Sequence, residues 1–213
     1  GSPLARLGRA VGAASPGTRR GVVLLLPPCE MVGTRRPTRL AAMAVWPLAR
    51  HLARAGKEAG LTTHTLHYRY CGWNGESADP AADAEWAVKE VVRRYGDVPV
   101  CLVGMAMGGR AALRAAGHEA VGSVVALAPW LPADSEPVKQ LVGRQVLIAH
   151  GTRDTEADPA LSYRYAQRVK KVNPHVCRFE VHSDTHTFSQ HRSEVFALTA
   201  DFVLGTVFGR RLS

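Results

Sequence analysis

The sequence predicts an α/β fold in which a mostly parallel sheet of about six strands carries helices on both faces. Short, continuously apolar runs such as residues 21–27 and 98–104 are typical of strands that are buried on both faces. These runs alternate with amphipathic stretches, and such alternation indicates crossover units with parallel strands. The length of 213 residues suits one domain with a sizeable core.

The elements follow one another along the chain in strand–helix order. Strands are expected at residues 21–27, 62–69, 98–104, 120–129, 144–151 and 175–183. Helices are expected at residues 39–60, 79–96, 107–117, 159–172 and 189–208. Residues 1–20 are rich in Gly, Ala, Arg and Ser and predict a loosely ordered N-terminal arm, which leaves 21–213 as a single domain.

Proline, glycine and aspartate mark the helix boundaries. Pro47 predicts a kink or the start of a new segment within the first helix. Asp79, followed by Pro80, is expected to cap the second helix, and Asp158, followed by Pro159, the fourth.

Composition argues against several classes of function. The net charge of +9 is spread over the chain in short basic pairs, without a basic helix interleaved with aromatic residues, so we expect a solvated surface and no nucleic-acid partner. The run Val22–Leu26 is too short to span a bilayer, and no membrane association is expected. The four cysteines lack metal-ligand spacing and favour a reducing, cytoplasmic location without disulfides. No cofactor is expected, and the sequence is silent on oligomeric state.

The stretch Gly104-Met105-Ala106-Met107-Gly108-Gly109 joins a predicted strand to a predicted helix. A sharp turn of this kind holds its central side chain in a strained conformation at the top of the sheet, and it needs small residues around that position. Ala106 stands where a serine nucleophile would stand. A tight turn without function is the alternative, whereas a phosphate loop is disfavoured because no Lys-Ser/Thr pair follows.

Two later loops supply an acid and a base. Asp154 follows the strand at 144–151, where its carboxylate could orient an imidazole, although it could also serve only as a turn residue. His186 follows the last strand, and the chain order of nucleophile position, Asp and His is the order expected of this arrangement. Metal pairs such as His64 with His67, or His182 with His186, lack an evident third ligand, so no metal is expected.

From about Gly21 to Phe208 the chain resembles the α/β-hydrolase superfamily, and within it the small dienelactone-hydrolase-like and esterase-like members. The resemblance rests on VGMAMGG, HGTRD and HTF in that order. It implies a Ser-His-Asp mechanism in which Asp154 holds the tautomer of His186 and His186 activates the nucleophile. The backbone N–H of Met107 would form one half of the oxyanion hole, and that of Cys29, or failing that Glu30, the other.

The expected site is open. Too little chain separates residues 129 and 144 for a large helical lid. Trp130, Trp73 and Met105 are the candidate substrate-binding residues at its border, although ordinary packing would equally explain them. An open, apolar-walled cleft favours an acyl ester, thioester or lactone as the small-molecule substrate.

Ala106 leaves alternatives open, because alanine cannot attack a carbonyl and the chain as written is expected to be inactive as a hydrolase. One hypothesis is a serine hydrolase whose nucleophile was deliberately replaced; the retained Asp154 and His186 favour it, as does the opening Gly1-Ser2-Pro3, which is typical of recombinant proteins. A second is a natural serine-less enzyme that uses the dyad as a general base, as in an isomerase, lyase or cyclase. The third is a non-catalytic binding protein.

Overall fold

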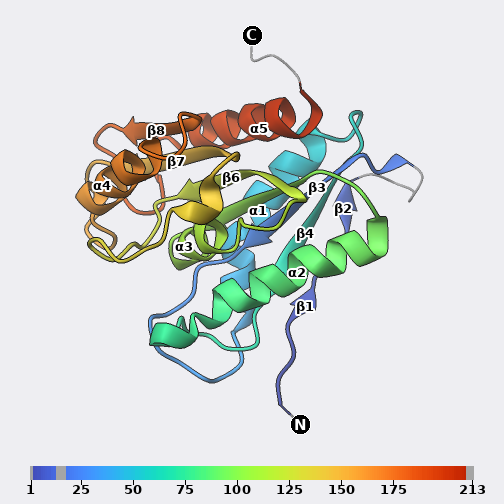
Figure 1. Cartoon of the computed structure of the whole chain (residues 1–213), viewed down its shortest axis with the longest axis horizontal. Coiled ribbons are helices and arrows are strands. Elements are labelled where there is room, and N and C mark those ends of the chain that lie inside the picture. Colours follow the sequence, from blue (N-terminus) through green and yellow to red (C-terminus); the bar gives the residue numbers. More distant parts are fainter. Residues whose placement is uncertain (1, 13–17, 210–213) are drawn as a thin grey trace.

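The computed structural model describes residues 2–12 and 18–209 and contains an eight-stranded sheet with five α-helices around it (Figure 1). The strands are β1 (Arg6–Leu7), β2 (Val11–Gly12), β3 (Gly21–Leu26), β4 (Leu61–His67), β5 (Val100–Met105), β6 (Val121–Leu127), β7 (Gln145–Gly151) and β8 (Val176–Val181). The helices are α1 (Arg39–Ala55), α2 (Asp79–Tyr95), α3 (Met107–Arg114), α4 (Pro159–Lys170) and α5 (Arg192–Phe208).

The six strands from β3 to β8 are parallel to one another and confirm the predicted sheet. The strand order across the sheet is β1-β4-β3-β5-β6-β7-β8, with β2 also pairing with β4. Because the strands are parallel, their carboxyl ends share one edge, where ligands bind in sheets of this kind.

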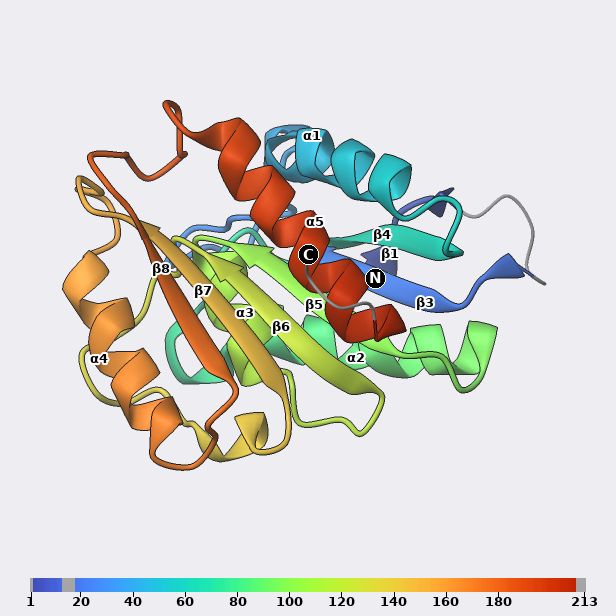
Figure 2. The same ribbon diagram turned by 90° about the horizontal axis from the view of Figure 1, so that it is seen from above.

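Alternate residues of each strand enter two separate cores, which explains the continuous apolar runs. Leu24 and Leu102 pack with α2, α3 and α4 on one face, whereas Leu25 and Val103 pack with α1 and α5 on the other. Figure 2 shows α1 and α5 together on one side of the sheet and α2 and α3 on the opposite side.

The prediction of a loosely ordered arm over residues 1–20 is wrong for residues 6–7 and 11–12, which form the strands β1 and β2. Arg6–Leu7 and Val11–Gly12 pair antiparallel with β4. Without them, the outer side of β4 would present unpaired backbone groups, and this pairing satisfies them. Residue 1 and residues 13–17 of the predicted arm lie outside the described residues.

The structure excludes one of the two alternatives at Pro47, corrects the prediction at Asp79 and confirms the one at Asp158. α1 runs as one helix through Pro47, so no new segment begins there. Asp79 is the first residue of α2 and Ala78 occupies the N-cap; the Asp79 carboxylate instead accepts hydrogen bonds from Asn74 and Arg69. Asp158 caps α4 as predicted, since its Oδ1 accepts from the Ala160 N–H at 2.9 Å.

The connection between β6 and β7 carries no large lid. Within residues 128–144 the structure contains a single 3₁₀ turn, Lys139–Leu141, and no α-helix. Among the described helices, none has both the length and the apolar character that crossing a membrane requires.

Candidate active site

Ala106 lies in a strained turn between β5 and α3. Its backbone has φ 55° and ψ −122°, a combination that is costly for any residue with a Cβ. The turn is held by hydrogen bonds, because the Ala106 N–H donates to Leu127 O at 2.9 Å and its carbonyl accepts from the N–H groups of Gly109 and Trp130. Strain that the surrounding structure maintains is concentrated at functional sites, and here it occurs at the position of the expected nucleophile.

Two glycines make this sharp turn sterically possible. A Cβ on Gly104 would lie 2.1 Å from Gly108 O, and a Cβ on Gly108 would lie 2.2 Å from Leu26 O. The start of α3 therefore approaches β5 and β3 more closely than any side chain allows.

The predicted acid and base are in contact. Asp154, in the loop after β7, has its Oδ2 2.6 Å from Nδ1 of His186, in the loop after β8. The Asp154 side chain is fully buried, and that of His186 is mostly buried. A carboxylate accepts only, so the proton in this contact belongs to Nδ1, and Nε2 is the nitrogen left for chemistry.

The loop that carries His186 is fixed by buried anchors. Phe188 is 2% exposed and, like Ser183, has a positive φ. The buried Asp184 accepts from the N–H groups of Thr185, Gln190 and His191; burial raises its pKa, but these hydrogen bonds outweigh burial and lower it. His186 is thus supported by a loop whose conformation is defined on both sides.

His150 is a residue that sequence reasoning missed. It is fully buried, and its Nε2 lies 3.1 Å from Asp154 Oδ2 and 2.9 Å from Ala157 O. Its Nδ1 lies 2.8 Å from the Ser162 hydroxyl. Burial lowers the pKa of His150 and outweighs the hydrogen bonds to Ala157 and Asp154, which raise it. The ring is therefore neutral at neutral pH. With the N–H groups of Glu156 and Ala157 on Oδ1, this ring fixes the Asp154 carboxylate.

Trp130 connects the strained turn to the acid loop. Its backbone N–H donates to Ala106 O at 3.1 Å, and its indole N–H donates to Glu156 O at 2.8 Å. Since the Glu156 N–H binds Asp154, and Asp154 binds His186, a continuous hydrogen-bonded path joins position 106 to the dyad. The half-buried Trp130 and Met105 both flank position 106.

The role expected for Trp73 is corrected. Its side chain is only 3% exposed and packs in the core beneath the guanidinium groups of Arg110 and Arg114, 4.1 and 5.5 Å from its ring centre. The two arginines are in turn held by the fully buried Glu136. Trp73 therefore supports α3 and offers little surface to a ligand.

The backbone N–H groups expected to form an oxyanion hole differ in availability. The Glu30 N–H donates to Cys71 O at 2.8 Å and is already used. In the part of the chain that the structure describes, the N–H groups of Cys29 and Met107 have no hydrogen-bond acceptor. Cys29 also borders a cavity of about 290 Å³, and burial, with smaller contributions from Cys71 and Glu30, raises the pKa of its thiol to about 12. The backbone N–H of Cys29, and not its thiol, is therefore the group available to bind an oxyanion.

The other histidines are not assembled into a metal site. His64 contacts Gly8 O and the Tyr95 hydroxyl, while His191 contacts Asp184. Within the described ranges, no group of three His, Cys, Asp or Glu residues is placed to hold a metal ion.

Comparisons with known proteins identify the fold that carries this site. Residues 40–177 match the family model for the alpha/beta hydrolase fold. The esterase Pf2001 of Pyrococcus furiosus is 16% identical, with a TM-score of 0.71 over 97% of this chain and 92% of that chain. Esterase 2 of Thermogutta terrifontis, solved as its sarin phosphonylation product, is also 16% identical, with a TM-score of 0.71 over 94% and 89%.

A third similar structure is XC6422 from Xanthomonas campestris, described as a serine hydrolase without a lid. It is 19% identical, with a TM-score of 0.61 over 93% of this chain and 86% of that chain. No curated protein matches the sequence. At these identities the structural likeness establishes the fold.

Proposed function

The chain belongs to the α/β-hydrolase fold family, and from this premise we propose that its active form is a serine hydrolase of esters, thioesters or lactones in which position 106 carries serine. One observation carries the proposal: Ala106 keeps the strained backbone of a nucleophile turn while the His186–Asp154 pair remains assembled. A non-catalytic protein gains nothing from either feature, and an enzyme that uses only the His186–Asp154 pair gains nothing from the strained backbone, which costs stability.

In the proposed mechanism, a serine at 106 attacks the acyl carbon and His186 Nε2 takes its proton. Asp154 stabilises the imidazolium through Nδ1. The N–H groups of Met107 and Cys29 stabilise the oxyanion. The imidazolium then protonates the leaving group, and a water activated by the same ring releases the acid.

The chain as written should lack this activity, because alanine has neither a lone pair for attack nor a proton to give. Loss of the nucleophilic serine lowers turnover on the order of 10⁶-fold in a serine protease. We therefore propose that Ala106 replaces a native serine. Two of the similar folds belong to proteins named esterases, and a third to a named lidless serine hydrolase, which supports this substrate class by analogy.

The remaining substrate-site assignments are also proposals. Trp130 and Met105 are the proposed walls of the acyl site, since both flank position 106. Four free cysteines favour a reducing compartment such as the cytoplasm.

The second candidate is a serine-less enzyme that uses His186 and Asp154 as a general base for abstraction of an acidic C–H proton. The observation in its favour is the alanine itself, together with a buried dyad that is complete without a nucleophile. A non-catalytic binding protein is the third, and it leaves the intact dyad without a purpose.

The experiment compares the chain as it stands with Ala106→Ser and with the double variant Ala106→Ser/His186→Ala. Each is assayed with short-chain p-nitrophenyl esters and labelled with a fluorophosphonate probe. We expect hydrolysis and labelling for Ala106→Ser alone. If Ala106→Ser neither hydrolyses nor labels, while the alanine form transforms a substrate that His186→Ala cannot, the general-base enzyme replaces the hydrolase.

A further inference from the structure

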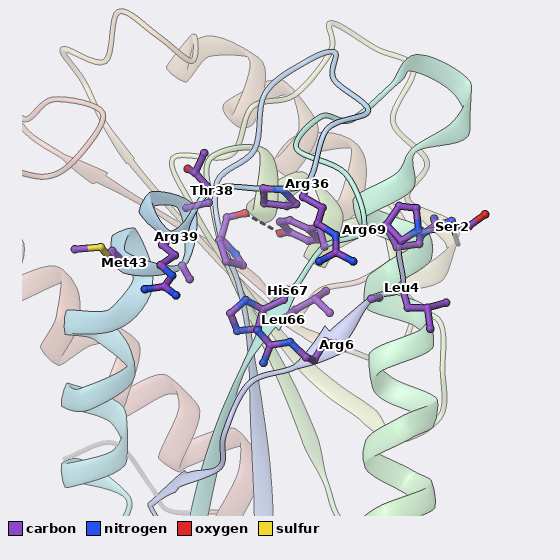
Figure 3. A pocket seen from close by; sticks show the side chains of 17 residues that line it. Ser2, Leu4, Arg6, Arg36, Thr38, Arg39, Met43, Leu66, His67 and Arg69 are labelled. Atoms are coloured by element: carbon purple, nitrogen blue, oxygen red, sulfur yellow. Dashed lines mark hydrogen bonds between the residues drawn. The ribbon is translucent and has the colours of Figure 1, made fainter.

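A second, larger cavity lies beside the one that borders Cys29 and has a distinct chemical character. Its volume is about 910 Å³, and it opens where β4 ends, between the N-terminal segment and the first turn of α1. Figure 3 shows the side chains of Arg6, Arg36, Arg39 and Arg69 around it, with His67 among them. Neither Asp nor Glu is among its described lining residues.

Three of the four arginines carry uncompensated charge. Arg69 is held by Asp83 and Asp79. Arg6, Arg36 and Arg39, by contrast, have no carboxylate partner among the residues that the structure describes. The cavity therefore gathers positive charge around a concave surface, which is the electrostatic form of a site for anions.

This clustering is produced by folding, since its members are distant in sequence. Arg6 lies on β1, where it pairs with His67 of β4, whereas Arg36 lies in the loop before α1 and Arg39 is the first residue of that helix. Elsewhere several arginines are neutralised, as for Arg110 and Arg114 with the buried Glu136. Bringing like charges together costs free energy unless an anion lies between them.

The pKa of His67 reports the same environment. Burial lowers it first, and the nearby positive charge of Arg6 lowers it further. His67 therefore adds no charge of its own at neutral pH and leaves the three unpaired guanidinium groups as the main cations.

The start of α1 adds backbone donors. The N-cap Thr38 makes no side-chain hydrogen bond to the helix, and the first turn contains no acidic residue. The positive end of a 17-residue helix thus borders the cavity through Thr38 and Arg39 without a counter-charge of its own.

The cavity adjoins the smaller cavity that borders Cys29, the residue whose backbone N–H is the expected oxyanion donor. Both cavities share the lining residues Arg36, Pro37, Thr38, Ala41 and Tyr68. Tyr68, which lines both cavities, is held by the hydrogen bond that its hydroxyl donates to Pro27 O at 2.7 Å.

We infer that this arginine cavity binds a phosphoryl group, because three guanidinium groups without a carboxylate partner among the described residues, together with a helix start, line one cavity and offer several donors to a multiply charged anion. The phosphate can come from a substrate, in which case the acyl compound hydrolysed at the candidate active site is phosphorylated, or from a free phosphate compound. Only the first source rests on the proposed function.

Binding is tested on the chain as it stands, by calorimetric titration with inorganic phosphate and with pyrophosphate at constant ionic strength. The variants are Arg6→Ala and Arg39→Ala. Their matched controls are Arg9→Ala in the same N-terminal segment and Arg54→Ala in the last turn of the same helix, and neither control residue lines the cavity.

We expect saturable binding of pyrophosphate that weakens about tenfold or more in each cavity variant and less than twofold in each control. The four substituted arginines, in the two cavity variants and the two controls, are all exposed, so each variant is expected to fold. Thermal melts check this. Absence of saturable binding, or equal weakening in all four variants, overturns the inference, because equal weakening indicates only general attraction to a basic protein.

The source of the phosphate is decided with Ala106→Ser and the butyryl esters of glycerol and of glycerol phosphate. If the substrate carries the phosphate, adding Arg39→Ala raises KM about tenfold for the phosphorylated ester and leaves KM for the neutral ester unchanged. If Arg39→Ala leaves KM for the phosphorylated ester unchanged, while the chain with Arg39 binds pyrophosphate, the substrate source is rejected and a free phosphate ligand is supported. Failure of Ala106→Ser on every ester rejects the hydrolase alone, since the titration is independent of catalysis.

Discussion

Asp154 Oδ2 lies 2.6 Å from His186 Nδ1, and this contact joins the loops that follow the last two strands of the sheet. Asp154 is held by His150 and by two backbone N–H groups, so the carboxylate is fixed before it receives the imidazole. A buried, fully hydrogen-bonded acid of this kind is suited to fixing the tautomer and the orientation of His186.

Asp154→Asn, introduced into Ala106→Ser, should lower kcat by on the order of 10³- to 10⁴-fold. The amide can present an N–H to Nδ1, which favours the tautomer whose Nε2 carries a proton and cannot act as base. Steady-state ester hydrolysis measures the effect. Asp158→Asn is the matched control, because it retains an oxygen to cap α4 and should leave kcat within about twofold. A similar kcat for both variants would contradict the role of Asp154.

Gly108→Ala should destabilise the fold by about 3 kcal/mol, because its Cβ would lie 2.2 and 2.3 Å from the carbonyl oxygens of Leu26 and Pro27. Urea denaturation measures the change. Gly122→Ala provides the control, since a Cβ on this exposed residue of β6 meets nothing within 4 Å and should change stability by less than about 1 kcal/mol. Equal effects of the two substitutions would show that the close approach of α3 to β3 is not required.

Glu136→Gln should destabilise the fold by about 3 kcal/mol. The buried carboxylate binds both Arg110 and Arg114, and its removal leaves two partly buried guanidinium groups without a counter-charge. Asp134→Asn breaks a pair with Arg164 in which both side chains are at least half exposed, and it should cost less than about 0.5 kcal/mol. Both changes are measured by urea denaturation, and a small effect of Glu136→Gln would exclude a structural role for this cluster.

Stability should fall as the pH drops below about 6.5. Burial lowers the pKa of His64 and of His150 from 6.5, so below that pH the unfolded chain binds more protons than the folded chain. Each histidine can then contribute a loss of up to about 1.4 kcal/mol per pH unit, until its folded-state pKa is reached. Denaturation between pH 5 and 8 measures the slope.

His64→Gln provides the test of that assignment. It should flatten the acid side of the stability profile and leave the shape above pH 7.5 unchanged, because both states of His64 are then neutral. An unchanged slope between pH 5 and 6.5 would mean that His64 does not couple protonation to folding.

The candidate site was predictable in part because its main residues follow strand ends in a fixed chain order. Ala106, Asp154 and His186 could each be placed from local pattern, since carboxyl ends of parallel strands share an edge. His150 gave no such signal, because a histidine inside an apolar strand shows its role only through the partners that surround it. Trp73 was misjudged for the same reason: nothing local indicates that Arg110 and Arg114 cover its ring.

The sequence by itself determined the parallel sheet, its helices and the strained turn, because hydrophobic periodicity, glycine and proline act over a few residues. Only the tertiary structure decided that residues 6–12 complete the sheet beside β4, and that Pro47 is accommodated within one helix. It also decided that Arg6 and Arg39 face one cavity. These outcomes depend on pairings between segments far apart in the chain, whose energies arise only when folding brings the partners into contact.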